Sequence, residues 1–127
     1  MVLPTYFRSF HRLFEDCIIH SKRNSYVTAA STPKEAKYGY VFKHCKLTAE
    51  PGVDKVYLGR PWRPYAYTLF IECELGKHIV LAGWHNWGKQ SNEETARYME
   101  YKNTGEGANA SERVAWSKQL TKKKLRR

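Results

Sequence analysis

Long apolar segments are absent from this sequence of 127 residues, and so are paired cysteines. No stretch is long and apolar enough to cross a bilayer, and residues 1–8 lack the apolar core that a secretory signal needs. The three cysteines contain no CxxC pair and cannot all form disulfides, so they suit neither a zinc site nor a disulfide framework. We therefore expect no membrane contact, no signal peptide in the chain as written, and cysteines that serve as small core residues.

Acidic residues are scarce, because 12 Asp and Glu stand against 22 Lys and Arg, for a net charge of +10. Most of the excess lies at the two ends: residues 121–127 hold five positive charges, residues 1–12 hold two, and neither segment holds an acid. Residues 13–120 keep 15 basic and 12 acidic residues. A basic terminal run is typical of a solvated chain end, so the pattern argues against a specific nucleic-acid role.

Three segments of the sequence, residues 13–19, 41–47 and 69–75, align without a gap. They share the pattern aliphatic-Phe-x-polar-Cys-x-aliphatic at a spacing of 28 residues. A fixed period in this range is typical of a repeat architecture. The pattern does not follow a helical period, and its flanks are rich in Val, Ile, Tyr and Thr, which favours strands. The repeat predicts an all-β parallel β-helix in which like residues stack along an inner face, among them Cys17, Cys45 and Cys73.

Residue composition predicts where the remaining strands and turns lie. The expected strands cover residues 26–30, 38–47, 55–59 and 68–75. The expected turns contain proline or glycine and cover residues 31–33, 50–52 and 59–61. From Gly83 onward the repeat fails. The charges of residues 91–101 indicate a surface segment, and residues 103–107 indicate a turn rather than a phosphate-binding loop.

Two clusters look like parts of a binding site. In residues 57–65, a glycine and two prolines flank Arg60, a planar fork of donors for a carboxylate, and Trp62, a flat apolar face. The pair suits an acidic sugar, but an ordinary surface stack is an equally good interpretation. Residues 82–88 add two more tryptophans, which favours a carbohydrate groove unless one of them covers the open C-terminal end of the solenoid. His85 has no Ser or Cys elbow nearby, so nothing supports a hydrolytic triad.

The segment Leu58-Gly-Arg-Pro-Trp62 resembles the LGRPW signature of the pectin methylesterase (pectinesterase) family. The similarity covers residues 13–120 and the C-terminal half of the family. It implies a right-handed parallel β-helix and a carboxylic ester hydrolase that removes methyl groups from esterified galacturonate in pectin. Five more motifs stand in the family's order and approximate spacing: Phe14-Glu-Asp-Cys17, Val27-Thr-Ala-Ala30, Tyr38-Gly-Tyr-Val-Phe42, Ala82-Gly-Trp84 and Glu100-Tyr-Lys-Asn-Thr-Gly-Glu-Gly-Ala-Asn109.

The resemblance also implies roles for individual residues. Arg60 would hold a nucleophilic Asp in its ionised form and correct orientation, and Trp62 would pack against the sugar ring. Ala29, Tyr65 and Trp87 fall where the family has substrate-groove residues. No metal or organic cofactor is implied. The implied partner is methyl-esterified pectin, and the implied setting is cell wall modification or pectin degradation by a secreted or cell-envelope protein.

The family's two catalytic aspartates, one nucleophile and one general acid and base, find no match. Counting back from Phe14 places the nucleophile at Pro4, and Asp16 and Asp54, the chain's only aspartates, do not suit the role. We therefore expect a truncated fragment made of a non-matching segment 1–12, a partial β-helix domain 13–120 without its N-terminal coils, and a basic tail 121–127. The missing N-terminal half is the expected partner, without which the chain should be poorly soluble.

Two other functions stay open at this stage. One is a non-catalytic module that grips acidic polysaccharide through Arg60, Trp62 and Trp87. The other is a nucleic-acid binder driven by its tails, in which case deleting residues 121–127 would abolish binding.

Overall fold

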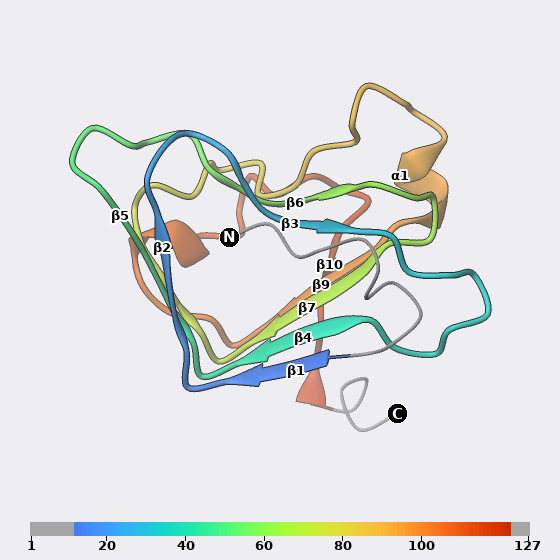
Figure 1. Ribbon diagram of the computed structural model, residues 1–127, viewed down its shortest axis with the longest axis horizontal. Coiled ribbons are helices and arrows are strands. Elements are labelled where there is room, and N and C mark those ends of the chain that lie inside the picture. The colour runs from blue at the N-terminus through green and yellow to red at the C-terminus, as the bar shows by residue number, and fades with distance from the viewer. Residues whose placement is uncertain (1–11, 123–127) are drawn as a thin grey trace.

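The computed structural model describes residues 12–122, which form a solenoid of short strands (Figure 1). The chain passes in turn through three sheets, with strand orders β1-β4-β7-β9-β10, β2-β5-β8 and β3-β6. All of their pairings are parallel, which confirms the predicted parallel β-helix. The elements are β1 (Arg12–Glu15), β2 (Ile18–Ser21), β3 (Tyr26–Ala30), β4 (Tyr40–Lys43), β5 (Lys46–Ala49), β6 (Tyr57–Pro61), β7 (Tyr67–Ile71), β8 (Glu74–Leu75), α1 (Asn92–Thr95), β9 (Arg97–Tyr101), η2 (Glu106–Ala108) and β10 (Lys118–Gln119).

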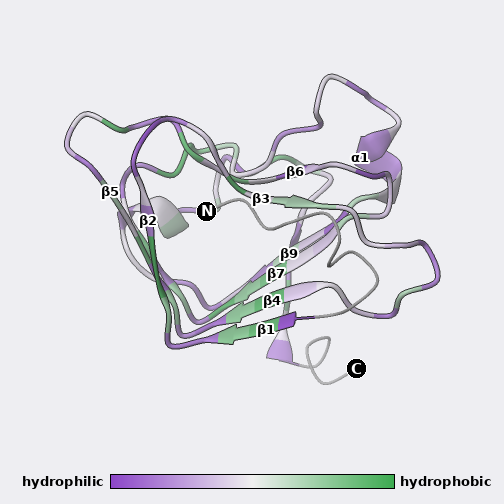
Figure 2. Ribbon diagram, in the orientation of Figure 1, coloured by the Kyte–Doolittle hydropathy of each residue, from purple (hydrophilic) through white to green (hydrophobic). Residues whose placement is uncertain are grey.

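The 28-residue repeat sets the register of the large sheet. Phe14 pairs with Phe42 and Phe42 with Phe70, so the three rings form one ladder. Neighbouring ring centroids lie 5.0 and 4.7 Å apart, and the rings are nearly parallel. Figure 2 shows the apolar residues of β1, β4 and β7 along the same side of the solenoid. Stacking of like residues between coils therefore supplies the core, as the repeat predicted.

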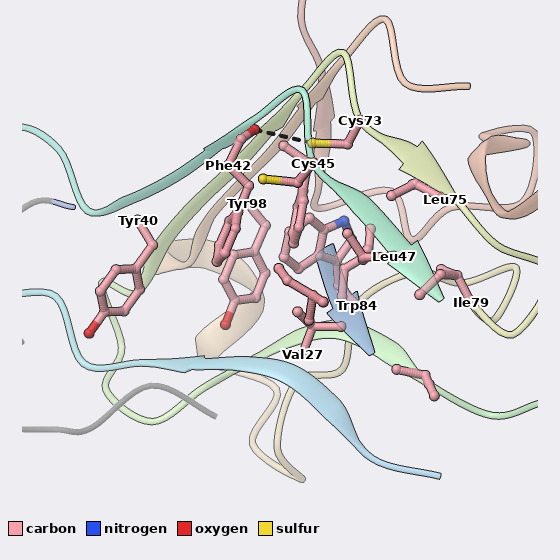
Figure 3. Packing of buried hydrophobic residues seen from close by; sticks show 14 of the residues in the cluster. Val27, Tyr40, Phe42, Cys45, Leu47, Cys73, Leu75, Ile79, Trp84 and Tyr98 are labelled. Carbon is pink, nitrogen blue, oxygen red and sulfur yellow. Dashed lines mark hydrogen bonds between the residues drawn. The ribbon is translucent and has the colours of Figure 1, made fainter. Parts of the chain in front are cut away.

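The cysteine ladder is also confirmed. Cys45 and Cys73 are buried, Cys17 is partly buried, and all three thiols are free. Each buried thiol donates a hydrogen bond to a carbonyl of the preceding coil, Cys45 to Phe14 at 3.4 Å and Cys73 to Phe42 at 3.3 Å (Figure 3). Burial raises the pKa of Cys73 to about 12, so this thiol stays protonated and acts as a core residue.

The polar residue before each cysteine forms a corner between two sheets. Asp16, His44 and Glu72 have left-handed backbones, with φ of 57°, 55° and 49°. The predicted single strands 38–47 and 68–75 are therefore wrong, because each is broken at this corner into two strands, β4 and β5 or β7 and β8. A left-handed residue turns the chain out of one sheet and into the next.

The predicted surface segment 91–101 is wrong as well. Its second half is β9, which extends the large sheet beyond β7, and both Tyr98 and Glu100 are buried. Glu100 takes the ladder position of Phe70, and its carboxylate is neutralised by Arg113, with Nε at 2.9 Å from Oε2. Trp84 Nε1 and Gln119 Nε2 also donate to this carboxylate. The coil continues with a buried ion pair in place of the phenylalanine.

The predicted turn 59–61 is a third correction. Gly59, Arg60 and Pro61 belong to β6, and the bend begins only at Trp62. Gly59 serves close packing rather than a turn, because a Cβ there would collide with the Thr28 hydroxyl and lie 3.1 Å from the Trp84 ring. None of the described helices is long and apolar enough to span a membrane. Apart from Arg12, Thr121 and Lys122, the predicted end segments 1–12 and 121–127 lie outside the described residues.

Candidate functional site

The sheet formed by β3 and β6 brings the sequence-predicted site residues together. Its register pairs Ala29 with Arg60 and Ala30 with Pro61. Trp62 follows at once, and its N–H donates to the Ala30 carbonyl at 3.0 Å. The loop that carries Trp87 leaves the next coil beside β6, since the His85 N–H donates to the Gly59 carbonyl at 3.1 Å. Three neighbouring coils thus deliver Ala29, Arg60 and Trp87 to one region.

Arg60 is held by aromatic rings rather than by an acid. Its guanidinium carbon lies 3.7 Å from the centroid of the Trp87 ring and 4.7 Å from that of Tyr26. The Nε atom is buried, and no described residue accepts a hydrogen bond from it. Cation–π contacts of this kind orient a guanidinium while leaving its donors available to an anion.

An aromatic cluster supports this arrangement. The Tyr26 and Tyr57 rings stack at 5.3 Å, and the His85 ring meets both edge-on at 5.6 and 5.1 Å. His85 Nδ1 accepts from the Trp87 N–H at 2.9 Å, and Trp87 has a left-handed backbone with φ of 59°. His85 therefore positions the Trp87 loop and contacts no Ser or Cys nucleophile among the described residues.

A hollow of about 500 Å³ lies between the two exposed tryptophans, and its lining begins at Pro61, the residue that follows Arg60. The Trp62 and Trp87 side chains are nearly half exposed, at 46% and 44%, and their ring centroids lie 6.5 Å apart at 41°. Two cations line the hollow, and none of its described lining residues is acidic. They are Pro61, Trp62, Arg63, Pro64, Trp87, Gly88, Lys89 and Asn92.

Ala29 and Tyr65 do not line the hollow between Trp62 and Trp87. Ala29 is buried in β3, where it pairs with Arg60. Tyr65 lines a neighbouring hollow of about 310 Å³ that shares only Arg63 and Pro64 with the first. The Tyr65 carbonyl accepts from Arg97 Nε and Nη2, at 3.1 and 2.8 Å. The structure thus brings Arg60, Trp62 and Trp87 together and leaves Tyr65 at one side.

The two tryptophans of residues 82–88 divide between core and surface. Trp84 is only 1% exposed and stacks on Tyr98, with ring centroids 4.2 Å apart (Figure 3). Burial raises the pKa of Tyr98 well above its ordinary value, while the charge of Arg60 opposes the shift. Trp84 therefore closes the core, whereas Trp87 faces the candidate site.

A comparison with family models supplies the deciding observation. The Pectinesterase model matches residues 9–126 of the 127-residue chain. The chain belongs to the pectinesterase family.

Among curated relatives of this pectinesterase chain, Pectinesterase 31 of Arabidopsis thaliana is 39% identical over 109 residues. That match covers 85% of the chain but 34% of the relative, so the chain spans about a third of its length. The solved pectin methylesterase from carrot superposes with a TM-score of 0.77 at 28% identity, covering 90% of this chain and 40% of the carrot protein. A pectin methylesterase solved in complex with a hexasaccharide superposes with a TM-score of 0.73 at 27% identity, with 90% and 42% coverage.

Within residues 12–122, the candidate site offers a cation and exposed aromatic rings, which suit an anion and a sugar ring, but it contains no pair of carboxylates for acid and base chemistry. Asp16 lies at an exposed corner, 4.0 Å from His44 Nδ1, and Asp54 is exposed at the end of another loop. No group of three or more His, Cys, Asp or Glu within the described residues could hold a metal ion.

Sequence reasoning missed three residues of the candidate site: Tyr26, Arg63 and Lys89. Tyr26 escaped notice because β3 and β6 pair at an offset of 31 residues rather than 28, so the repeat does not align them. Arg63 and Lys89 follow Trp62 and Trp87 closely in the sequence. A search for cations next to exposed tryptophans would have found both.

Proposed function

We propose that the chain is the substrate-binding C-terminal part of a pectin methylesterase, with residues 13–120 forming a partial β-helix domain. The reaction is hydrolysis of the methyl ester of a galacturonate in pectin to a carboxylate and methanol. The observation that supports this proposal is Arg60, whose buried Nε has no acceptor among the described residues. Its guanidinium is held by Trp87 at 3.7 Å, ready to receive a carboxylate.

Each site residue has a physical role in the proposal. Arg60 keeps a nucleophilic Asp ionised and fixes its direction, because an adjacent cation favours the charged form. Trp62 offers its exposed ring to the sugar. Ala29, with only a methyl group, leaves room for the substrate next to Arg60. Trp87 holds Arg60 and borders the groove, and Tyr65 extends it along the chain.

The carboxylates are proposed to come from coils that stack on β1, β2 and β3. Within residues 12–122, these three strands are paired on one side only. Parallel edges of this kind accept further parallel strands by the same hydrogen bonding that joins the described coils. The proposed partner is therefore an N-terminal half of the β-helix, and the proposed setting is a cell wall reached by secretion.

Methanol release from methyl-esterified pectin tests the proposal. Two proteins would be compared: the chain alone, and the chain fused behind the part of the carrot enzyme that it does not cover. We expect release only from the fusion, and Arg60→Ala should lower the rate by about 10²–10³-fold, the usual loss when a preorganised charge contact is removed. Lys77→Gln, which removes an exposed cation elsewhere, is the matched control.

Two results would contradict the proposal. A folded fusion that releases no methanol would remove the esterase assignment, and release that survives Arg60→Ala would remove the role of Arg60. Release by the chain alone, abolished by Arg60→Ala, would place the catalytic carboxylates within this chain.

A second candidate function is a non-catalytic module that binds acidic polysaccharide. The favouring observation is the hollow between Trp62 and Trp87, which is lined by cations while the described residues offer no catalytic carboxylate pair. Binding of oligogalacturonate by a protein that releases no methanol even in the fusion would select this function.

A further inference from the structure

The loop that follows η2 carries an Asn-x-Ser motif that the candidate site does not use. Asn109 is followed by Ala110 and Ser111, which matches the acceptor motif for N-linked glycans, Asn-x-Ser or Asn-x-Thr with x other than proline. The sequence contains five asparagines, and only Asn109 has Ser or Thr two positions later. Such a motif can be modified only where an enzyme reaches the amide nitrogen, so it requires a surface loop.

The structure places this motif at the surface. Asn109 and Ser111 are both exposed, and they lie in the irregular segment between η2 and β10. Asn109 Oδ1 accepts from the Ser111 N–H at 3.1 Å. No described residue forms a hydrogen bond with Asn109 Nδ2 or with the Ser111 hydroxyl. The nitrogen that would receive a sugar and the hydroxyl that the motif requires are therefore both accessible.

Asn103, which precedes η2, provides a contrast within the same part of the chain. Its Oδ1 accepts from the Cys73 N–H at 2.8 Å, and its Nδ2 is buried. Asn103 is followed by Thr104 and Gly105, so it lacks a hydroxyl residue two positions later. Exposure and the acceptor motif thus coincide at Asn109 and are both missing at Asn103.

The loop of the motif is held by the core and lies outside the candidate site. Arg113, which forms the buried ion pair, donates from Nη1 to the Asn109 carbonyl at 3.4 Å. The Arg113 N–H donates to the Ala110 carbonyl at 3.2 Å. Residues 109–111 line neither the hollow between the two exposed tryptophans nor the neighbouring hollow. A glycan on this loop would be attached to a fixed backbone and would leave the lining of both hollows unmodified.

We propose that Asn109 is a site of N-linked glycosylation, where the amide Nδ2 receives an oligosaccharide from a lipid-linked donor. In this transfer the bond between C1 of the first sugar and the lipid pyrophosphate breaks, and a bond between C1 and Nδ2 forms. Nδ2 gives up one proton, the lipid pyrophosphate leaves, and nothing is oxidised or reduced. The inference goes beyond the proposed hydrolysis and rests on the proposed function only for its setting, because secretion brings the chain to the donor.

Mass spectrometry of the full chain, produced behind a signal peptide in cultured eukaryotic cells, tests the inference. Chain from the cells and from the medium is pooled, so that retention inside the cells does not affect the result. Trypsin releases residues 103–113 as one peptide, because Lys102 precedes it and Arg113 ends it. Peptide N-glycosidase in water labelled with heavy oxygen converts a glycosylated asparagine into a labelled aspartate. The label should appear at Asn109, and Asn103 in the same peptide should stay unlabelled as an internal control.

Substitutions within the motif separate glycosylation from other changes of mass. Asn109→Gln and Ser111→Ala should each abolish the glycosidase-sensitive mass, whereas Ser111→Thr should retain it because the motif is kept. Glu112→Gln, at the exposed residue next to the motif, is the matched control and should be glycosylated like the wild type. All four positions changed are exposed, so folding should be retained. An unmodified Asn109 in the wild-type chain would overturn the inference, and so would a glycosidase-sensitive mass that persists in Asn109→Gln.

The glycan and the methanol assay are independent measurements. Asn109→Gln in the fusion should leave the rate of methanol release unchanged, because residue 109 lines neither hollow. A glycan at Asn109 of a fusion that releases no methanol would reject the esterase function and keep the modification site. Methanol release by a fusion that passes through the secretory route without a glycan at Asn109 would keep the esterase function and reject the site.

Discussion

Arg60 in β6 and Trp87 in the following coil are in direct contact, with the guanidinium carbon 3.7 Å from the centroid of the indole ring. The two residues lie 27 positions apart in the sequence, and the stacking of parallel coils brings them together. The contact orients a cation without neutralising it. In the proposed site the aromatic residues have two roles, since they hold Arg60 and their exposed faces suit a sugar ring.

Alanine substitution tests whether Trp84 stabilises the core while Trp87 serves the candidate site. Trp87→Ala should change the free energy of unfolding by less than about 1 kcal/mol, because its side chain is 44% exposed. It should weaken oligogalacturonate binding about tenfold through loss of the ring face and of the Arg60 contact. Trp84→Ala should cost about 3–5 kcal/mol, because the residue is 1% exposed and stacks on Tyr98. Urea unfolding and calorimetry measure both; similar losses of stability in the two variants would contradict the division.

The left-handed corners make a prediction about His44. A β-branched residue fits poorly at its φ of 55°, so His44→Val should destabilise the chain by about 1–2 kcal/mol. His44→Gly should be tolerated, because glycine adopts this conformation freely. Lys43→Val, one residue earlier within β4, is the control and should have little effect. Urea unfolding of the three variants measures the difference, and an equal cost for valine at both positions would show that the corner is not strained.

The sequence predicted those parts of the fold that depend on like residues stacking on like. The Phe and Cys ladders follow from the 28-residue period, and the parallel β-helix follows from the ladders. The period could not reveal β9, because Glu100 occupies the ladder position of Phe70 and is compatible with the core only when Arg113 folds back onto it. A contact between residues 13 positions apart in an irregular segment leaves no periodic signal.

The candidate site was predictable in its residue types and only partly in its geometry. Arg60, Trp62 and Trp87 were selected from the sequence because an arginine and exposed tryptophans suit an acidic sugar. Their common location was not predictable from the repeat, because β3 and β6 pair three residues out of step with it. The separate position of Tyr65 also depends on local structure, since the bend after β6 directs it to the neighbouring hollow.

The buried ion pair between Glu100 and Arg113 predicts a large asymmetry between single and double substitutions. Arg113→Met would leave the Glu100 carboxylate buried without its cation, which should destabilise the chain by about 3–5 kcal/mol. A Glu100→Gln, Arg113→Met double variant should recover part of that loss, because the uncompensated charge is gone. Lys46→Met, which breaks the exposed pair with Glu74, should cost less than about 1 kcal/mol. Urea unfolding of the three variants measures these losses of stability. A double variant less stable than Arg113→Met would contradict the argument.

His78 predicts a pH dependence of stability. Burial lowers its pKa from the ordinary value of 6.5, the charge of His20 adds to the shift, and its buried Nε2 has no partner among the described residues. The unfolded chain therefore binds a proton at this position over a pH range in which the folded chain does not. The stability contributed by neutral His78 is present above pH 6.5 and is lost as the pH falls below it.

Between about pH 7.5 and about pH 5.5, the unfolding free energy of the wild type should drop further than that of His78→Leu. A His78→Leu profile parallel to that of the wild type would show that His78 titrates alike in the folded and unfolded states.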